Sequence, residues 1–202
     1  MNHEEFHPEP PSDTLSGIDS EDSVPFLTTS DHAPGELRIP EGLRTFSGTP
    51  NGARRSVGIT VSRFNGDVTS LLLEGAVEAL EGAGVVRGAI DILPVPGSFE
   101  LPLAAMALAR TRRYGCVLAI GCVIRGETSH FDYVSAEAAS GVQVAGLETG
   151  IPISFGVLTC NTREQALARA GGLQGNKGRD AALSGLEMAD ALARLRAGVN
   201  TR

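Results

Sequence analysis

The stretch GCVLAIGCVIRGETSHFDYV, residues 115–134, starts as a nearly continuous apolar run and ends in polar and charged side chains. An apolar run of this kind is typical of a central strand in a parallel sheet, because such a strand is covered on both faces. After Ile124 come Arg125, Glu127, His130 and Asp132, with two hydroxyl residues among them. The sequence therefore predicts a buried strand that delivers polar side chains to one edge of a sheet.

The segments on either side of this stretch alternate between β-rich runs and helical patterns. Such alternation predicts right-handed βαβ units and a parallel sheet with helices on both faces. We expect an α/β fold, a three-layer α/β/α flavodoxin-like domain with a four-stranded parallel sheet. Asp67 is expected to cap the first helix and Gly84 to end it. Expected strands cover residues 56–62, 88–95, 115–124 and 151–160, and expected helices cover 67–84, 98–113, 132–150, 162–170 and 179–195.

Charge is unevenly distributed along the 202 residues. Residues 1–50 hold 10 acidic and 2 basic residues, whereas residues 51–202 hold 14 acidic and 15 basic ones. We expect a disordered acidic extension over residues 1–50 and one folded domain over residues 51–202. The folded part has no basic stripe, which argues against nucleic-acid binding. Because no apolar run could span a membrane or form a signal core, we expect a cytoplasmic protein without membrane contact.

The three cysteines, Cys116, Cys122 and Cys160, lie in apolar stretches and form no CxxC motif. We interpret them as reduced core thiols. A nucleophilic Cys122 is the alternative, although the folded part offers no second histidine beside His130 to activate it. No residues show the spacing of metal ligands, so the sequence predicts no metal site.

Two phenylalanines, Phe64 and Phe99, lie in short polar loops after the first two expected strands. Ligands of parallel sheets bind outside the carboxyl ends of the strands. A flat apolar ring at that edge could stack on a planar heterocycle. The alternative is that both rings cap the edge of the core.

Two stretches predict the binding of an anion such as phosphate. RGETSH (125–130) opens a helix, so free backbone amides lie beside the hydroxyls of Thr128 and Ser129. ARAGGLQGNKGRD (168–180) holds Arg169 and Lys177, whose cationic side chains suit phosphate oxygens. An ordinary hydroxyl N-cap and an exposed basic loop are the alternatives.

His130 follows the first anion-binding stretch. Histidine exchanges protons near neutral pH, which predicts general acid–base catalysis, with a structural histidine as the alternative. The sequence has no Ser-His-Asp order and no Walker or Rossmann glycine pattern. Covalent and dinucleotide chemistries are therefore disfavoured.

Six segments together resemble the lumazine synthase family of riboflavin biosynthesis. They are SRFN, VPGSFELPLA, GCVIRGETSHFDYV, GIPISFGVLT, TREQALARAG and GNKGRDAA, and they follow the family's order over about residues 57–195. The resemblance implies condensation of 5-amino-6-(D-ribitylamino)uracil with 3,4-dihydroxy-2-butanone 4-phosphate. The products are 6,7-dimethyl-8-ribityllumazine, phosphate and water, and no cofactor or metal is needed.

The resemblance also implies roles for single residues. The ring of Phe64 stacks on the pyrimidine, the carboxylate of Glu100 accepts hydrogen bonds from ribityl hydroxyls, and His130 transfers protons. Residues matched to the pyrimidine and ribityl pocket are Phe64, Asn65, Ser98, Phe99, Glu100, Cys122, Val123 and Ile124. Residues matched to the phosphate side are Glu127, Thr128, Arg169 and Lys177.

Phe155 matches a residue that a neighbouring subunit contributes, so the resemblance implies a homo-oligomer. The family forms pentamers, and in some members twelve pentamers assemble into an icosahedral shell. The compact loop GGLQGNKG favours the shell, whereas the acidic extension is longer than the family's N-terminal strand. Ser98 stands where alanine is common.

Three other functions remain open. They are a flavin- or lumazine-binding module without turnover, a structural shell protein, and a related enzyme that joins two lumazines. A stacking site alone has no need of His130, Arg169 and Lys177 together. An enzyme that joins two lumazines binds no phosphate, so Arg169 argues against it.

Overall fold

The computed structural model describes residues 37–198 of the chain. The expected disorder of the acidic extension falls for the most part on residues 1–36, which lie outside the described residues. The compact unit that contains the sheet begins at Gly42. The expected domain boundary at residue 50 stays a prediction.

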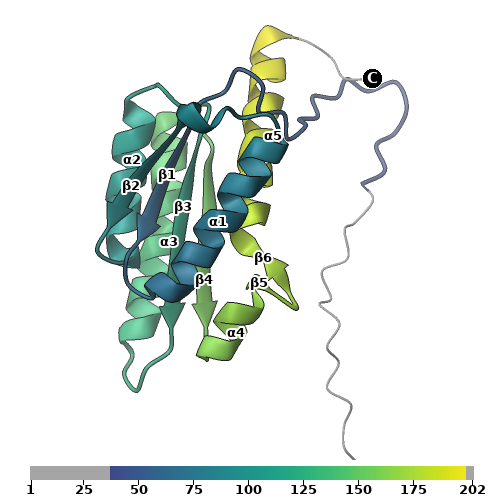
Figure 1. Cartoon of the computed structure of the whole chain (residues 1–202). Helices are drawn as coiled ribbons and strands as arrows, with labels where there is room; N and C mark the ends of the chain where they lie inside the picture. Colours follow the sequence, from purple (N-terminus) through teal and green to yellow (C-terminus); the bar gives the residue numbers. More distant parts are fainter. Residues whose placement is uncertain (1–36, 199–202) are drawn as a thin grey trace, which may run out of the picture. The chain divides into compact units, whose positions relative to one another are not determined.

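Four parallel strands form the sheet, in the order β2-β1-β3-β4 (Figure 1). Their bounds are Val57–Ser62 for β1, Ile90–Val95 for β2, Cys116–Ile124 for β3 and Ile153–Cys160 for β4. β3 lies between two neighbours, and all but the last two of its residues are buried. The apolar run at residues 115–124 therefore predicted the central strand correctly.

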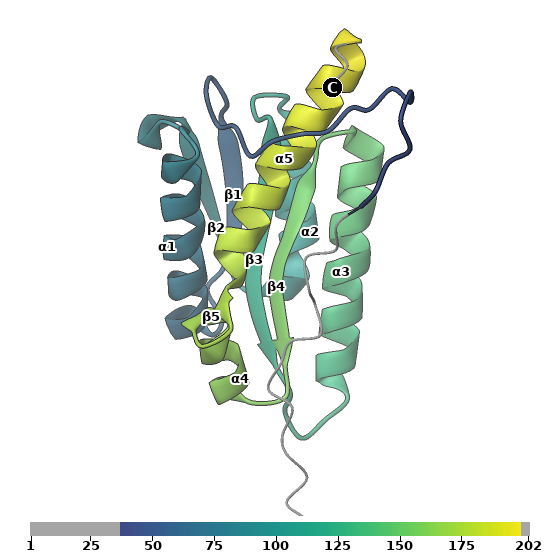
Figure 2. The same ribbon diagram turned by 90° about the vertical axis from the view of Figure 1, so that its right-hand side faces the viewer.

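Helices cover both faces of this sheet (Figure 1, Figure 2). α1 (Gly66–Gly82) and α5 (Lys177–Ala197) lie on one face, and α2 (Leu101–Arg110) and α3 (His130–Thr149) lie on the other. The short helix α4 (Arg163–Ala168) follows β4. These layers confirm the expected α/β/α flavodoxin-like architecture.

Apolar side chains fill the space between the sheet and each helix layer. On the side of α1 and α5, Leu72, Leu80, Leu118 and Leu186 are fully buried. Each such leucine stabilises the fold by roughly 1.5–3 kcal/mol relative to an exposed position. On α5, apolar residues recur every three positions at Leu183, Leu186, Ala189, Leu192 and Leu195. This series drifts around the helix, because one turn takes about 3.6 residues. Leu195, at the end of that series, is therefore exposed.

The start of α1 differs from the expectation. Asn65, not Asp67, is the N-cap, and its backbone is left-handed with a φ of 56°. Asparagine tolerates this conformation better than most residues. Asp67 lies in the first turn and forms an ion pair with Arg163 of α4. The expected stop at Gly84 is confirmed by its φ of 94°.

The predicted loop before α5 contains a small antiparallel hairpin, formed by β5 (Ala170–Gly172) and β6 (Gly175–Asn176). The hairpin places Asn176 at the N-cap of α5, where its Oδ1 accepts a hydrogen bond from the N–H of Gly178. α5 therefore begins at Lys177, two residues earlier than predicted. Gly178 packs so closely on α1 that a Cβ would collide with the α1 backbone.

The segment before β1 packs along α5. A Cβ at Gly48 would collide with the α5 backbone. Asp190 of α5 is 7% exposed, and its carboxylate accepts hydrogen bonds from the backbone N–H and the hydroxyl of Thr49. The same carboxylate forms ion pairs with Arg55 and Arg194. Asp190 therefore joins α5 to the segment that leads into β1.

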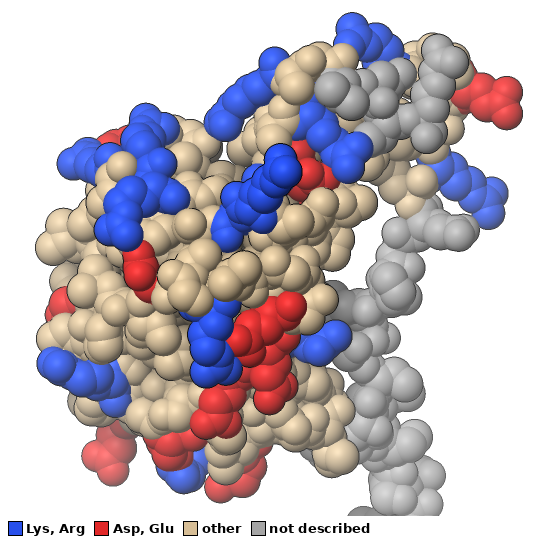
Figure 3. All heavy atoms as spheres, turned by 45° about the horizontal axis from the view of Figure 1, so that its top comes forward, with Lys and Arg blue, Asp and Glu red and all other residues tan. Residues whose placement is uncertain are grey.

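Basic side chains gather at the end of the sheet where the strands begin, with acidic ones among them (Figure 3). Ion pairs near the strand starts include Arg113 with Asp91, and Arg110 with Glu148. Of the helices in residues 37–198, none is long and apolar enough to cross a membrane.

Candidate active site

A cleft of about 670 Å³ opens at the edge of the sheet where the strands end. Its walls come from the segments that follow β1, β2 and β3 and from the first turn of α3. The structure brings most of the predicted site residues together here. Those that line the cleft are Phe64, Asn65, Ser98, Phe99, Glu100, Cys122, Val123, Ile124, Thr128 and His130.

The end of β3 presents backbone groups to this cleft. β1 pairs with β3 only as far as Ile120, whereas β4 stays paired with β3 to Ile124. On the β1 side, the backbone of Cys122–Ile124 therefore lies beyond the last ladder position. Asn65 Nδ2 donates a hydrogen bond of 2.9 Å to the carbonyl of Cys122. The side chain of Asn65 thus fixes the turn after β1 against the end of β3.

Glu100 holds the loop after β2. Its Oε2 accepts a hydrogen bond of 2.9 Å from the backbone N–H of Gly97, within the capping box of the 3-10 helix Ser98–Glu100. This contact places the carboxylate at the cleft wall. A carboxylate has two oxygens and several lone pairs, so this contact leaves capacity for further donors.

Four aromatic side chains among the described residues line the cleft. Phe64 is 71% exposed and Phe99 is 58% exposed, so neither ring caps the core in the described chain. Phe131 and Tyr133 come from the first turn of α3. Flat apolar faces around a partly polar cleft suit a planar heterocyclic ligand.

The loop between β3 and α3 carries Thr128 and His130 to the cleft. α3 begins at His130 after Ser129, whose side chain makes no capping hydrogen bond. Thr128 Oγ1 accepts a long hydrogen bond of 3.4 Å from the N–H of His130. Glu127 is exposed and lies outside the cleft lining. The amides of the α3 start, near its positive dipole end, can therefore meet an anion without the Glu127 carboxylate intervening.

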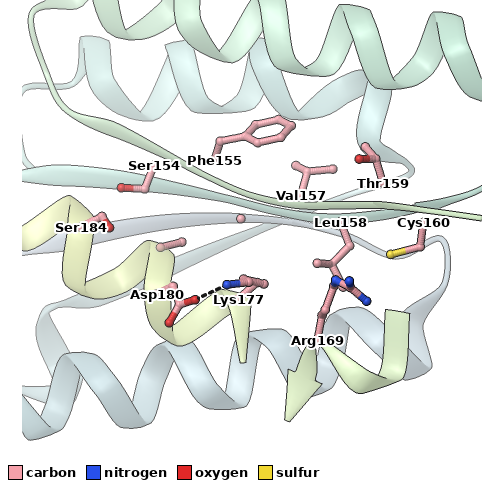
Figure 4. A pocket seen from close by; sticks show the side chains of 12 residues that line it. Ser154, Phe155, Val157, Leu158, Thr159, Cys160, Arg169, Lys177, Asp180 and Ser184 are labelled. Atoms are coloured by element: carbon pink, nitrogen blue, oxygen red, sulfur yellow. Dashed lines mark hydrogen bonds and ion pairs between the residues drawn. The ribbon is translucent and has the colours of Figure 1, made fainter. Parts of the chain in front are cut away.

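A second cleft of about 480 Å³ lies along β4 and contains the predicted residues Phe155, Arg169 and Lys177 (Figure 4). Glu127 lines neither of these two clefts, contrary to its predicted place in the site. Phe155 projects from one face of β4, and Arg169 and Lys177 lie beyond the other face. Arg169 Nη1 donates to the carbonyl of Gln165 at 3.1 Å, and Lys177 Nζ pairs with Asp180 at 2.8 Å. Within one chain, the expected phosphate cations thus line a different cleft from His130.

Residues 54–193 match the sequence profile of the 6,7-dimethyl-8-ribityllumazine synthase family. The chain belongs to this family. A 6,7-dimethyl-8-ribityllumazine synthase from Gemmatimonas aurantiaca is 50% identical over 148 residues, which cover 73% of this chain and 90% of that protein. One from Syntrophus aciditrophicus is 53% identical over 135 residues, covering 67% and 88% respectively.

Family membership confirms the resemblance that the six sequence segments indicated. It does not by itself test the role of any residue in this chain. The structure separates the predicted site residues into two groups, which the sequence did not predict. The residues predicted to bind the pyrimidine and to transfer protons line the cleft at the strand ends, whereas Arg169 and Lys177 lie on the α5 side of β4.

The cysteines are free and buried, as predicted. Burial raises the pKa of the Cys122 thiol to about 12 and that of Cys116 to about 12. Burial also raises the pKa of Cys160, and the positive charge of Arg169 partly opposes that shift. A thiol with such a pKa holds its proton at neutral pH, so the geometry disfavours a lumazine synthase reaction through a Cys122 nucleophile.

Sequence reasoning missed several residues at these clefts. Phe131 and Tyr133 line the first cleft, and Asp180 lines the second. The sequence contained a signal for the two aromatic residues, because FDYV directly follows His130. Side chains in the first turn of a helix point back toward the start of that helix. Asp180 gave a weaker signal, since an acidic residue three positions after Lys177 is common on helix surfaces.

Proposed function

We propose that this protein catalyses the condensation of 5-amino-6-(D-ribitylamino)uracil with 3,4-dihydroxy-2-butanone 4-phosphate to give 6,7-dimethyl-8-ribityllumazine. The match of residues 54–193 to the lumazine synthase family carries the proposal. The cleft at the strand ends supports it, because aromatic rings, free backbone groups and a histidine meet there. Free, buried thiols fit the reducing conditions of a cytoplasmic location.

The pyrimidine binds between aromatic rings and the end of β3. The exposed ring of Phe64 stacks on it, and Phe99 closes the other side of the cleft. Backbone groups of Val123 and Ile124, which extend past β1, hydrogen-bond its polar edge. The remaining lone pairs of the Glu100 carboxylate accept hydrogen bonds from hydroxyls of the ribityl chain.

The reaction joins two molecules and then removes phosphate and water. The 5-amino group of the pyrimidine condenses with the ketone, and an imine forms with loss of one water molecule. Loss of a proton from the hydroxyl-bearing carbon next to the imine then expels phosphate and leaves an enol, which tautomerises to a ketone. Attack of the ribityl-bearing nitrogen on this ketone closes the ring with loss of another water molecule. His130 moves protons in these steps, while the amides of the α3 start stabilise the departing phosphate. Binding both reactants in one cleft removes much of the entropic barrier.

The phosphate cations come from a neighbouring copy of the chain. Arg169 and Lys177 line a cleft beside β4, and within residues 37–198 β4 pairs with β3 alone. Unpaired strand edges and exposed apolar grooves favour contact with another protein surface. The free edge of β4 is one such surface, and an apolar groove that includes Leu147, Ile153 and Met188 is another. We therefore place the second cleft of one subunit against the first cleft of the next, in a closed ring of five.

Subunit complementation tests this shared site. His130→Ala and Arg169→Ala chains are unfolded together, refolded as a mixture, and assayed against each variant refolded alone. With random mixing, about a quarter of the sites take a native residue at both positions, so activity rises toward that fraction of wild type. If His130 and Arg169 served the same chain's site, every site would lack one of them and mixing would add nothing.

The catalytic proposal is tested by a direct assay of the purified protein with both substrates. Lumazine absorbance and released phosphate are followed together. Equal amounts of both products support the enzyme, whereas tight pyrimidine binding without either product would leave a binding module. Light scattering on the same sample measures the assembly. A ring gives five times the chain mass of 21.0 kDa, and a shell of twelve rings gives a far larger particle.

A further inference from the structure

Arg125 joins the loop that carries His130 to the segment after β4. It is the first residue after β3, and its guanidinium forms a two-pronged ion pair with Asp132, with N–O distances of 2.9 and 3.3 Å. Its Nε donates a hydrogen bond of 3.1 Å to the side chain of Asn161, directly after β4. One side chain therefore spans the loop, the first turn of α3 and the end of the neighbouring strand.

The same guanidinium lies over the ring of Phe131, with 4.2 Å between its central carbon and the ring centroid. Phe131 lines the cleft that contains His130. The backbone N–H of Arg125 donates to the carbonyl of Cys160 at 2.9 Å, which fixes the base of the side chain. Arg125 is thus anchored at its backbone, and its planar head contacts Phe131 and Asp132, the two residues that directly follow His130 in α3.

Other restraints on this loop are weak in the described part of the chain. A Cβ at Gly126 would meet no atom within 4 Å, so the loop is not packed there. Ser129 caps α3 without a side-chain hydrogen bond, and the Thr128–His130 contact is long at 3.4 Å. The contacts of Arg125 therefore connect the start of α3, where His130 lies, to the end of β4.

We propose that Arg125 is a positioning residue that sets the place of His130 for proton transfer. The proposal rests on the proposed lumazine synthase reaction. The Arg125 side chain is 43% exposed and that of Asp132 57%, and exposed pairs of this kind contribute only about 0–1 kcal/mol to stability. A displacement of about 1 Å at a reacting group, by contrast, can slow a reaction by about a hundredfold.

The test is a double-mutant cycle between Arg125→Met and His130→Ala, with kcat and KM measured for both substrates. Arg125→Met lowers kcat about tenfold and leaves KM for the pyrimidine within about threefold, because the stacking site is untouched. In the His130→Ala background, Arg125→Met lowers kcat no further, because the group that it positions is absent. Arg125→Lys does not restore kcat, since an ammonium can neither form the fork nor lie flat on Phe131.

The matched control is Arg113→Met. Arg113 also pairs with an aspartate, Asp91, and also lies beside an aromatic ring, Tyr114, but near the starts of the strands. Its kinetic constants stay at wild-type values, and its midpoint of thermal unfolding matches that of Arg125→Met. If Arg125→Met does not fold, Asp132→Asn replaces it in the cycle, because it removes the charge from the same pair.

Three results would overturn the proposal. They are wild-type kcat in Arg125→Met, losses of kcat that multiply in the double variant, and a raised KM for the sugar phosphate at unchanged kcat. The last result would make Arg125 a direct phosphate ligand. An inactive wild-type protein is a different outcome, because it overturns the proposed reaction and not the role of Arg125 alone.

Discussion

Replacing Asp190 by alanine should destabilise the protein more than the loss of any exposed ion pair. The Asp190 side chain is 11% exposed, and the side chains of its partners Arg55 and Arg194 are 20% and 32% exposed. The variant leaves both arginines without this carboxylate and removes the acceptor for the N–H and hydroxyl of Thr49. Breaking a largely buried pair in this way costs about 3 kcal/mol.

This loss of free energy corresponds to a fall of roughly 6–12 °C in the midpoint of thermal unfolding for a domain of this size. Circular dichroism at 222 nm, at one fixed protein concentration, measures it. Glu148→Ala is the control, because its pair with Arg110 is exposed on both sides and contributes at most about 1 kcal/mol. Equal midpoints for the Asp190 and Glu148 variants would refute the reasoning.

The same carboxylate predicts a dependence of stability on pH. The hydrogen bond from Arg194, and further ones from Thr49, hold the pKa of Asp190 below its ordinary value of 3.8. A depressed folded-state pKa contributes stability that is complete above about pH 3.8 and declines as the pH falls through the folded-state pKa. The free energy of unfolding of Asp190→Asn should therefore fall furthest below that of wild type at neutral pH. The difference between the two proteins should become smaller below pH 3.8.

Further variants test the site. His130→Ala should lower kcat about a hundredfold without abolishing turnover, because binding both reactants in one cleft still accelerates the reaction. Single-turnover absorbance measures this rate, and a complete loss of turnover would contradict the prediction. Arg169→Ala should raise KM for the sugar phosphate about 10–100-fold, whereas Arg179→Ala, which changes an exposed arginine outside both clefts, should not. Phe64→Ala should weaken pyrimidine binding about three- to tenfold by titration, and Phe64→Tyr should retain it. Cys122, with a pKa of about 12, should resist alkylation at pH 8 until the protein is unfolded; rapid labelling of the folded protein would contradict its burial.

Local patterns accounted for the strands, the helices and the polar segments at the strand ends. The run at residues 115–124 predicted β3, and the helix expected from residue 162 begins where Thr162 caps α4 by accepting a hydrogen bond from the N–H of Gln165. Patterns of a few residues carry such information, because burial and helix capping act over one or two turns. They failed at Asn65, whose backbone is left-handed and whose side chain donates a hydrogen bond to Cys122, a residue distant in the sequence.

The sequence by itself determined the family, the parallel α/β fold and the chemistry gathered after β1, β2 and β3. Parallel strands end at one edge of a sheet, so residues that follow different strands meet there without further information. Only the tertiary structure decided that β4 lies at one edge of the sheet and that Arg169 and Lys177 line another cleft than His130. It alone also revealed the contacts of Arg125 with Asp132 and Asn161. The order of the strands and the contacts of long side chains depend on packing between segments that are distant in the sequence. Local periodicity in the sequence does not predict that packing.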